Sequence, residues 1–368
     1  MRMKKSGDEN IAFPRVRNFL RLWSEVAQST FPFMREEFGE LDEMDRLFVT
    51  VCESVVKPEA FEYAKWKGFG RPTTNRTSVF KAFLFKALYD IPTTRELVRR
   101  LRRDMRARRL CGWNSAGDVP SEGQFSVVNK EFAERGFAEE WFGDYVRTYV
   151  EGDVTATVSY DSAPITVRAK AENAKRMLEE LDPDQPMPPS RLEWQAAEDA
   201  DTALAELPQN CDWGCKRDAH GKPKHWKGGK VHAAVTRDGI PVAVAYTSAS
   251  LHDSQVMIPL VKKASERMEH GFDLADAAYD AEAIREASAE EGNVPVIDAN
   301  SRRGERRHMT ATEREVYRDR GADERFFSHL LDSHGGRHVR VRTPKKVSQH
   351  LMYGVLVIAV EQTMRLLC

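Results

Sequence analysis

The chain contains 368 residues, 41% of them hydrophobic and 31% charged, and its formal net charge is −1. This length and composition are typical of a soluble globular protein with about two domains. The most apolar stretch, residues 351–367, is interrupted by Glu361, Gln362 and Arg365, which excludes a simple membrane span and favours a buried core helix.

The cysteines and the first residues indicate the compartment of the protein. Five cysteines are scattered over the chain, and the N-terminal residues carry basic side chains without the apolar run of a secretory signal. An odd number of scattered cysteines favours reduced thiols over a disulfide scaffold. We therefore expect a protein of the cytoplasm that has no membrane partner.

Charge is segregated along the chain although the total is close to zero. Residues 91–110 carry a net charge of +6 and residues 216–230 a net charge of +5. Residues 337–346 contain five basic and no acidic residues, whereas residues 170–206 have a net charge of −6. Basic patches are typical of proteins that bind a phosphate backbone, although any single patch also suits a solubilising helix face.

Residues 1–150 show the pattern of a helical domain. Apolar residues recur at helical spacing in residues 78–91 and again in residues 137–150. Gly- and Pro-containing breaks separate the helices, and Pro120 and Ser121 are expected to mark the entry to a new helix. One of these helices is strongly cationic.

From residue 153 the pattern changes to that of β-strands. Residues 153–167 are rich in Val and Thr and predict a strand that ends near Asp161. Residues 230–248 predict a hairpin with an Asp-Gly turn. Two further short strands are expected, one that ends at or near Asp276 and one within residues 294–300, and each is preceded by a helix.

This order of elements predicts the fold class. A hairpin followed by alternating helices and strands indicates an α/β domain over residues 151–368, with a mixed five-stranded sheet flanked by helices. Residues at about 169–209 are acidic and contain several prolines, so we interpret them as a helical excursion from this domain. The last long helix is expected to begin with a capping box of Thr312 and Glu315 and to end at Gly335.

Three acidic residues occupy positions that suit a site, namely Asp161 and Asp276 at strand ends and Glu324 in the last helix. In open α/β sheets, sites form beyond the carboxyl ends of the strands. Taken singly, each acid is more often a turn or cap residue. At 100° per residue, however, Tyr317, Arg320 and Glu324 lie within about 60° of arc, beside an apolar stripe. A helix face that is merely exposed to solvent does not require its polar side chains to be aligned in this way, so the alignment favours a functional site.

These motifs resemble those of the DDE transposases of bacterial insertion sequences, whose glutamate helix reads Tyr-x2-Arg-x3-Glu-x6-Lys. The segment YRDRGADE gives Tyr317, Arg320 and Glu324 in that spacing. YDSAPI resembles the motif of the first aspartate and points to Asp161, and LADAAYD resembles that of the second and points to Asp276. The stretches GRPTTNRTSVFKAFLFKALYDIPTTRELVRRL and GDVPSEGQF resemble the helical N-terminal domain of the family, so the likeness covers most of the chain.

The resemblance implies a ribonuclease-H-like catalytic domain at residues 151–368, preceded by a DNA-binding helical domain at residues 1–150. It implies a metal-dependent enzyme that binds element ends, cleaves phosphodiester bonds and joins the 3′-OH to target DNA. Asp161, Asp276 and Glu324 are the expected catalytic residues and the ligands of two Mg²⁺ or Mn²⁺ ions, with Asp161 bridging them. Such a metal pair clamps the attacking and leaving oxygens, and carboxylate oxygens suit these hard cations.

By the same resemblance, Tyr317 and Arg320 hold DNA phosphate near the cleaved bond, and Arg suits bidentate phosphate contact. His252 and Asp253 are expected near the site, although a helix cap and its neighbour are the preferred interpretation. Trp226 could stack on a base, or equally cover the core. The expected partner is double-stranded DNA, both the terminal inverted repeats and the target DNA. The chain is also expected to form a homodimer on DNA and to be associated with the nucleoid. The remaining expected DNA contacts are Lys227, Lys230, Arg99 and Arg103.

One position departs from the family pattern, because the Lys of the family falls on Leu331. In relatives that Lys is thought to contact DNA near the active site, so its replacement predicts weaker strand transfer. The alternative is a catalytically weakened, transposase-derived DNA-binding protein. A ribonuclease-H-like nuclease that acts on other nucleic acids is a third interpretation, and the DNA-binding N-terminal domain weighs against it.

A second constellation could bind zinc, because Cys211, Cys215, His220 and His225 are all potential ligands. The spacing Cys-x3-Cys is not the tightest knuckle spacing, and the stretch is loop-like. We therefore expect packed thiols and DNA-facing histidines at these positions and no structural zinc.

Overall fold

The structure is a computed structural model of the chain, and its backbone contacts divide the chain into two compact units. The sheet unit contains residues 151–327 and 339–347. The helical unit contains the residues up to 150, residues 328–338 and those from 348 onward. The last helix thus groups with the helical unit by its contacts, and a single functional domain over residues 151–368 stays a prediction. The structure describes residues 14–27, 39–70, 72–172, 189–217, 221–300 and 308–367.

The N-terminal part of the chain is helical, as predicted. Ser121 caps the N-terminus of one of these helices, because its side chain accepts a hydrogen bond from the backbone N–H of Gln124 at 3.4 Å. This confirms the helix entry expected at that position. The elements are α1 (Pro14–Ala27), α3 (Glu43–Val55), the 3₁₀ helix η1 (Pro58–Ala64), α4 (Arg76–Leu88), α5 (Thr94–Arg103), α6 (Met105–Leu110), α7 (Glu122–Arg135) and α8 (Phe137–Tyr149).

The C-terminal helix α15 (Pro344–Leu367) completes the core of the helical unit from residue 348 onward. Tyr353 is 2% exposed, its ring stacks on Phe83 at a centroid distance of 5.2 Å, and its hydroxyl donates to Asn129 Oδ1 at 3.0 Å. Residues 351–360 are all buried, which confirms the predicted core helix. None of the helices in the described residues has the length and apolarity needed to cross a membrane.

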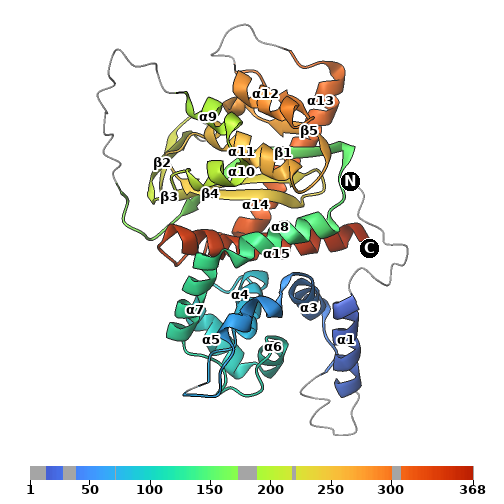
Figure 1. The fold of residues 1–368 in the computed structure, drawn as a ribbon, viewed down its shortest axis with the longest axis vertical. Helices are drawn as coiled ribbons and strands as arrows, with labels where there is room; N and C mark the ends of the chain where they lie inside the picture. Colours follow the sequence, from blue (N-terminus) through green and yellow to red (C-terminus); the bar gives the residue numbers. More distant parts are fainter. Residues whose placement is uncertain are drawn as a thin grey trace. The chain divides into compact units, whose positions relative to one another are not determined.

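The sheet unit is built on a mixed sheet in the strand order β2-β3-β1-β5-β6, with β4 also paired to β3 (Figure 1). Strand β1 pairs antiparallel with β3 and parallel with β5, and β5 pairs parallel with β6. Six strands form where five were predicted, because the segment interpreted as loop-like forms β2 and pairs with the first half of β3. The strands are β1 (Asp153–Thr166), β2 (Asp212–Arg217), β3 (Pro223–Thr236), β4 (Pro241–Ser248), β5 (His270–Ala275) and β6 (Val294–Ile297).

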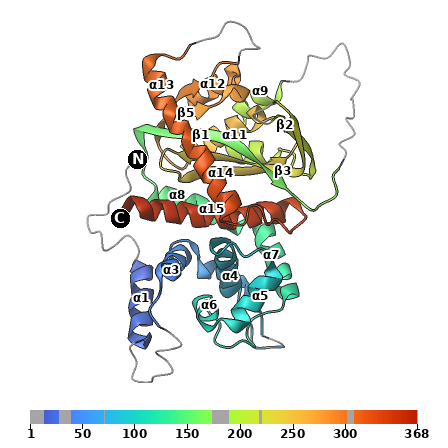
Figure 2. The same ribbon diagram turned by 180° about the vertical axis from the view of Figure 1, so that it is seen from behind.

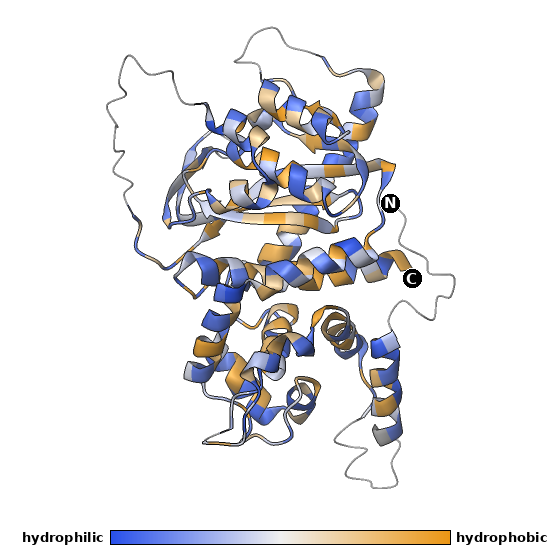
Figure 3. Ribbon diagram, in the orientation of Figure 1, coloured by the Kyte–Doolittle hydropathy of each residue, from blue (hydrophilic) through white to orange (hydrophobic). Residues whose placement is uncertain are grey.

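Helices cover both faces of this sheet, which confirms the predicted α/β class. The opposite views show α11 and α12 over one face, and α13 with the first half of α14 over the other (Figures 1 and 2). Hydrophobic residues gather in the strands between these layers (Figure 3). The covering elements are α9 (Arg191–Ala197), α10 (Ala200–Ala205), α11 (Ser254–Ser265), the 3₁₀ helix η2 (Ala277–Tyr279), α12 (Glu282–Glu290), α13 (Ala311–Tyr317), the 3₁₀ helix η3 (Arg318–Gly321) and α14 (Ala322–Asp332).

Strand β1 is longer than the sequence predicts, because it has two partners of different length. Its parallel pairing with β5 ends at Tyr160 and Ala275, close to the predicted strand end. Its antiparallel pairing with β3 continues to Thr166 and Gly228. Gly228 is required there, since a Cβ atom at this residue would lie 1.9 Å from the carbonyl oxygen of Ile165.

The last predicted helix is interrupted. The capping box forms two residues earlier than expected, between Thr310 and Glu313, and residues 318–321 form the 3₁₀ helix η3 between α13 and α14. Two side chains of β1 bind this region, because Thr157 donates to Asp319 at 3.0 Å and Ser159 donates to Asp323 at 2.5 Å. Since Gly321 weakens the helix locally, these contacts can set its path over the sheet.

A buried polar network fixes β5 against β1 and α12. Asp273 is 0% exposed and accepts hydrogen bonds from Tyr160 at 2.7 Å, Ser288 at 2.6 Å and Asn293 at 3.1 Å. His270 lies 2.7 Å from the same carboxylate. Burial acts to lower the pKa of His270, but the hydrogen bond and charge of Asp273 outweigh it and raise the pKa above its ordinary value. Every oxygen of this buried carboxylate is therefore satisfied.

We predict that Asp273→Ala lowers the free energy of unfolding by about 3–5 kcal/mol, because it leaves buried donors and a histidine without their partner. His270 has a raised pKa in the folded state, so its share of stability is present below its unfolded pKa and is lost as the pH rises through the folded value. The loss should therefore be larger in mildly acidic than in alkaline solution. Urea unfolding of the native chain and the variant, in mildly acidic and in alkaline solution, measures this difference in stability.

The matched control is Glu286→Ala, which changes an exposed carboxylate on α12. It should change the free energy of unfolding by no more than about 0.5 kcal/mol. Equal losses for the two variants would show that the network around Asp273 does not stabilise the sheet unit.

Candidate active site

Two aspartates lie side by side where the parallel pairing of β1 with β5 ends. The register that pairs Tyr160 with Ala275 places the next residues, Asp161 and Asp276, on neighbouring strands. This is the edge of an α/β sheet at which sites form. A third acid, Asp298, follows β6 in the same way, and its backbone N–H donates to the carbonyl oxygen of Ala275 at 3.2 Å.

Arg320 joins the two aspartates. Its Nη2 atom lies 3.4 Å from Asp161 Oδ2 and 3.5 Å from Asp276 Oδ2. The side chain of Arg320 is 24% exposed, that of Asp161 20% and that of Asp276 40%, so the group is partly shielded from solvent. One cationic nitrogen is thus shared by two carboxylates that come from different strands.

The electrostatics of Asp161 favour a cation at this point. Burial raises the pKa of Asp161, the N–H of Ser162 and the charge of Arg320 act to lower it, and the carboxylate of Asp276 raises it further. On balance the pKa of Asp161 is raised, so the positive charge around its ionised carboxylate does not fully compensate the effect of burial. Two carboxylates that already share a cationic nitrogen form a hard oxygen donor set, which fits a divalent cation such as Mg²⁺ or Mn²⁺.

Tyr317 belongs to the same electrostatic environment. Its side chain is half-buried, and burial raises its pKa. Arg320 opposes that change, whereas the carboxylates of Asp298, Asp276 and Asp161 add to it. Tyr317 is therefore close enough to the acids for their charge to act on it, and its contact with DNA phosphate stays a prediction.

Glu324 occupies the first turn of α14 and is exposed. Within the described residues it makes no hydrogen bond or ion pair. It follows Arg320 by four residues, the spacing at which helical side chains lie on one face. The structure thus brings Asp161, Asp276 and Arg320 into contact, and a role of Glu324 as third ligand stays a prediction.

Asp323 is an acid near the site that the sequence analysis missed. It is 1% exposed and accepts a hydrogen bond from Ser159, two residues before Asp161 on the same face of β1. Burial raises its pKa well above the ordinary value, the bond from Ser159 opposes this, and the charge of Asp161 adds to it. The polar alternation of Thr157, Ser159 and Asp161 is the sequence signal that predicts a polar partner over this face.

Lys230 and Asp253 form an ion pair beside the site. The ammonium of Lys230 donates to Asp253 Oδ1 at 2.8 Å and to the carbonyl oxygen of Leu251 at 2.7 Å, and the Lys side chain is 13% exposed. Asp253 precedes α11 without capping it through its side chain, and His252 is exposed beside it. A DNA contact of Lys230 stays a prediction, and it would require this ion pair to open.

The hairpin of β2 and β3 carries further predicted DNA contacts. Trp226 is half-buried, donates to the carbonyl oxygen of Gly229 at 3.0 Å and lies against Gly214, where a Cβ atom would come within 2.3 Å of the indole. Lys227 is half-buried on the same strand. Lys216 of β2 is exposed, and its charge acts to lower the pKa of Asp161. The hairpin therefore extends positive charge toward the aspartates.

The cysteine and histidine side chains of this hairpin are only partly described. Cys215 Sγ lies 3.9 Å from His225 Nε2, on paired residues of β2 and β3. Cys211 is buried, and its thiol lies 3.7 Å from the carbonyl oxygen of Ala169. His220 lies outside the described residues, so the expected absence of zinc here stays a prediction.

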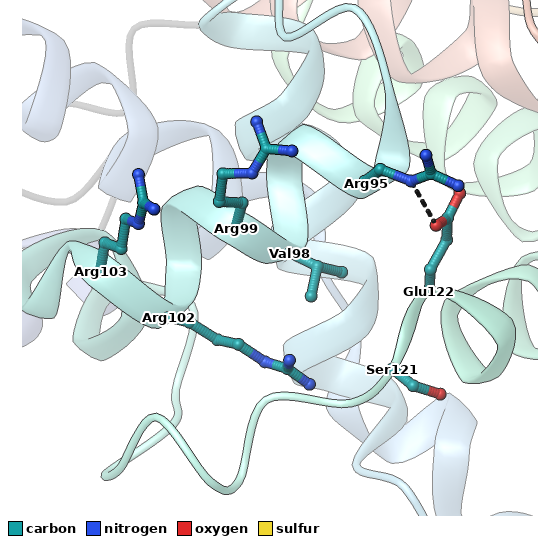
Figure 4. Close-up of a pocket in the computed structure, with 7 residues that line it drawn as sticks. All are labelled: Arg95, Val98, Arg99, Arg102, Arg103, Ser121 and Glu122. Atoms are coloured by element: carbon teal, nitrogen blue, oxygen red, sulfur yellow. Dashed lines mark hydrogen bonds and ion pairs between the residues drawn. The ribbon is translucent and has the colours of Figure 1, made fainter.

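Arg99 and Arg103 line a pocket on the helical unit between α5 and the start of α7 (Figure 4). Arg95 forms an ion pair with Glu122 at 3.2 Å. Within the described residues, Arg99 and Arg103 make no hydrogen bond or ion pair, and both are exposed. Their guanidinium groups are therefore available to an anion. The other lining residues are Val98, Arg102 and Ser121.

Two family models match the chain and together cover well over half of it. Residues 199–360 match a transposase DDE domain, and residues 37–131 match a transposase domain designated DUF772. Asp276, Arg320 and Glu324 fall within the first match, and Asp161 precedes it. No curated protein and no solved structure matches the chain.

We predict that Asp161→Asn raises the melting temperature of the metal-free chain at neutral pH. A carboxyl group whose pKa is raised on folding destabilises the folded state when it is ionised, and Asn cannot ionise. The gain should disappear in acid, where both folded and unfolded Asp161 are protonated. Thermal unfolding in the presence of EDTA measures it, with Asp238→Asn in the β3–β4 turn as control. A lower melting temperature at neutral pH would mean that the contacts with Arg320 and Ser162 outweigh burial.

Proposed function

We propose that this chain, which belongs to the DDE transposases of insertion sequences, cleaves DNA at the ends of its element and joins the freed 3′-OH to target DNA. The family consists of metal-dependent enzymes that act on DNA. The observation that carries the proposal is the position of Arg320 Nη2 between Asp161 and Asp276, where the parallel pairing of β1 with β5 ends. A cation is stabilised there by two carboxylates.

Asp161, Asp276 and Glu324 would hold two divalent cations, Mg²⁺ or Mn²⁺. Such ions activate the attacking oxygen and neutralise the charge that develops at the phosphate. The two aspartates are already in register and need no rearrangement of the sheet to share a cation. Glu324 is exposed on the first turn of α14, so its side chain is free to turn toward bound metal.

Arg320 would exchange its ion pairs for a DNA phosphate when the cations and DNA bind. Its planar guanidinium suits bidentate contact with phosphate oxygens, and the pair with the aspartates holds it near them beforehand. Tyr317 would orient the same phosphate through its hydroxyl. The attacking water or 3′-OH would approach from the side of the two aspartates.

Double-stranded DNA would contact both units through their basic surfaces. In the sheet unit, the hairpin residues Lys216, Trp226 and Lys227 would bind the strand near the aspartates. In the helical unit, Arg99 and Arg103 would bind backbone phosphates of the terminal inverted repeats. We infer that the residues up to 150 act as the DNA-binding domain and that the enzyme acts as a homodimer on DNA, close to the nucleoid.

A second function is favoured by Leu331, which stands where the family has a Lys. Leu331 lies half-buried near the end of α14 and cannot contact phosphate through a charge. The chain would then occupy element ends as a DNA-binding protein with weakened catalysis. The two functions differ in cleavage and not in binding, so a cleavage assay separates them.

We predict metal-dependent nicking of a labelled DNA fragment that carries the flanking sequence of the gene, at one position in each flank. Asp276→Asn should reduce nicking to background while DNA binding is retained, because it removes one metal ligand and no phosphate contact. Glu324→Gln and Asp298→Asn test which acid is the third ligand, and loss in Glu324→Gln alone agrees with the proposal. Asp238→Asn is the control that should cleave normally.

Leu331→Lys extends the same assay to the alternative function. Cleavage by Leu331→Lys but not by the native chain would show an intact metal site disabled by one missing phosphate contact. Binding without cleavage by any variant, in either Mg²⁺ or Mn²⁺, would establish the DNA-binding protein instead. Nicking that survives in Asp276→Asn would contradict the assignment of the aspartates.

We also predict that Arg99→Gln with Arg103→Gln weakens DNA binding and flattens its dependence on salt. Each lost phosphate contact should reduce the slope of log K against log salt concentration by about 0.9. Fluorescence anisotropy over a salt series measures the slope. The control is Arg147→Gln on α8, whose guanidinium is paired with Asp144 at 2.6 Å. The same slope in the native chain and the double variant would exclude these arginines from the DNA interface.

A further inference from the structure

Two histidines and a glutamate meet within the helical unit. His329 lies near the end of α14, His334 in the turn that follows, and Glu361 in the second half of α15. One ligand atom of each lies within 4.8 Å of the others. His334 is 6% and Glu361 16% exposed, so the group is largely shielded from solvent.

Hydrogen bonds already orient two of these side chains. His334 Nδ1 lies 3.4 Å from the carbonyl oxygen of Ala87, and because a carbonyl can only accept, Nδ1 carries the proton. Its Nε2 atom then faces Glu361 Oε2 at 3.4 Å. The other oxygen of Glu361 accepts from Arg365 at 2.6 Å. One lone pair of the imidazole and one carboxylate oxygen are thus directed at the same point.

His329 lacks the partner that a buried imidazole nitrogen requires. Its Nδ1 atom is buried and makes no hydrogen bond with any described residue. An ion pair between His334 and Glu361 would satisfy those two residues and leave His329 Nδ1 unpaired. A cation between the three residues would be held by one nitrogen of each imidazole and by the carboxylate, because imidazole nitrogen and carboxylate oxygen are both metal ligands.

We propose that His329, His334 and Glu361 bind one divalent transition cation of the zinc class. Two imidazoles and a carboxylate are a frequent ligand set for Zn²⁺, at about 2.0–2.2 Å from the metal, so the three ligand atoms need only small rotations to converge. The contact of His334 with the carbonyl of Ala87 is the outer hydrogen bond that metal-bound histidines usually make.

This site is distinct from the proposed catalytic site in ligand chemistry and in role. The aspartates offer only oxygen, which suits Mg²⁺ or Mn²⁺, whereas imidazole nitrogen selects Zn²⁺, Co²⁺ or Ni²⁺. The bound cation fastens the end of α14 and the turn that follows it to α15, and α14 is the helix that carries Glu324 in its first turn. The cation is therefore structural, and its binding is independent of DNA cleavage.

The test is a Zn²⁺ titration of the full chain after EDTA treatment, against a chromophoric chelator and in the presence of excess Mg²⁺. All variants carry Cys215→Ser, which removes the thiol beside His225. We expect one equivalent of tightly bound Zn²⁺, a visible Co²⁺ spectrum of a site with nitrogen ligands, and a higher melting temperature with Zn²⁺. His334→Gln and His329→Gln should lose all three effects.

Glu361→Gln keeps the shape of the side chain and is the variant that tests the site if a histidine variant fails to fold. The control is His338→Gln, which changes a histidine in the same turn that faces Asp90 at 3.4 Å and not the cluster. It should bind Zn²⁺ as the parent does. No Zn²⁺ binding by the parent, unchanged binding by Glu361→Gln, or equal loss in His338→Gln would each overturn the proposal.

Discussion

The pairing of β1 with β5 is the constraint on which the site depends. Because side chains alternate along a strand, a shift of one residue in this register would turn Asp161 or Asp276 to the other face of the sheet. The hydrogen bond from Tyr160, which directly precedes Asp161, to Asp273 joins the two strands inside the core. The buried network thus fixes the spacing of the two half-buried acids, Asp161 and Asp276, through residues outside the proposed site.

The second constraint is the attachment of η3 and α14 to the face of β1. Thr157 and Ser159 bind Asp319 and Asp323, and Asp161 follows them on the same face. These two hydrogen bonds place Arg320 where its guanidinium reaches both strands. The strand therefore carries an acid of the site and also the anchors of the helix that supplies its arginine.

The sequence predicts much of this arrangement, because the signals are local. Strand ends, the hairpin turn and the helix entry at Ser121 follow from alternation, turn residues and capping. The motif residues Asp161, Asp276 and Arg320 lie close together, and their role in a site stays a prediction. Strand β2, the length of β1 and the 3₁₀ break before α14 depend on pairing partners that are distant in the sequence, and local pattern does not contain them. The same limit applies to Asp323, whose burial depends on Ser159, and to the cluster of His334 and Glu361.

The return of α15 to the helical unit has a consequence for synthesis of the chain. Phe83 and Asn129 receive their contacts from Tyr353, which leaves the ribosome more than two hundred residues after them. Domains that fold during synthesis require all of their parts. The helical unit cannot complete its core until α15 has been translated, whereas the strands of the sheet precede α15 in the chain. A copy that lacks α15 therefore lacks the contacts that Tyr353 makes in the core of the helical unit.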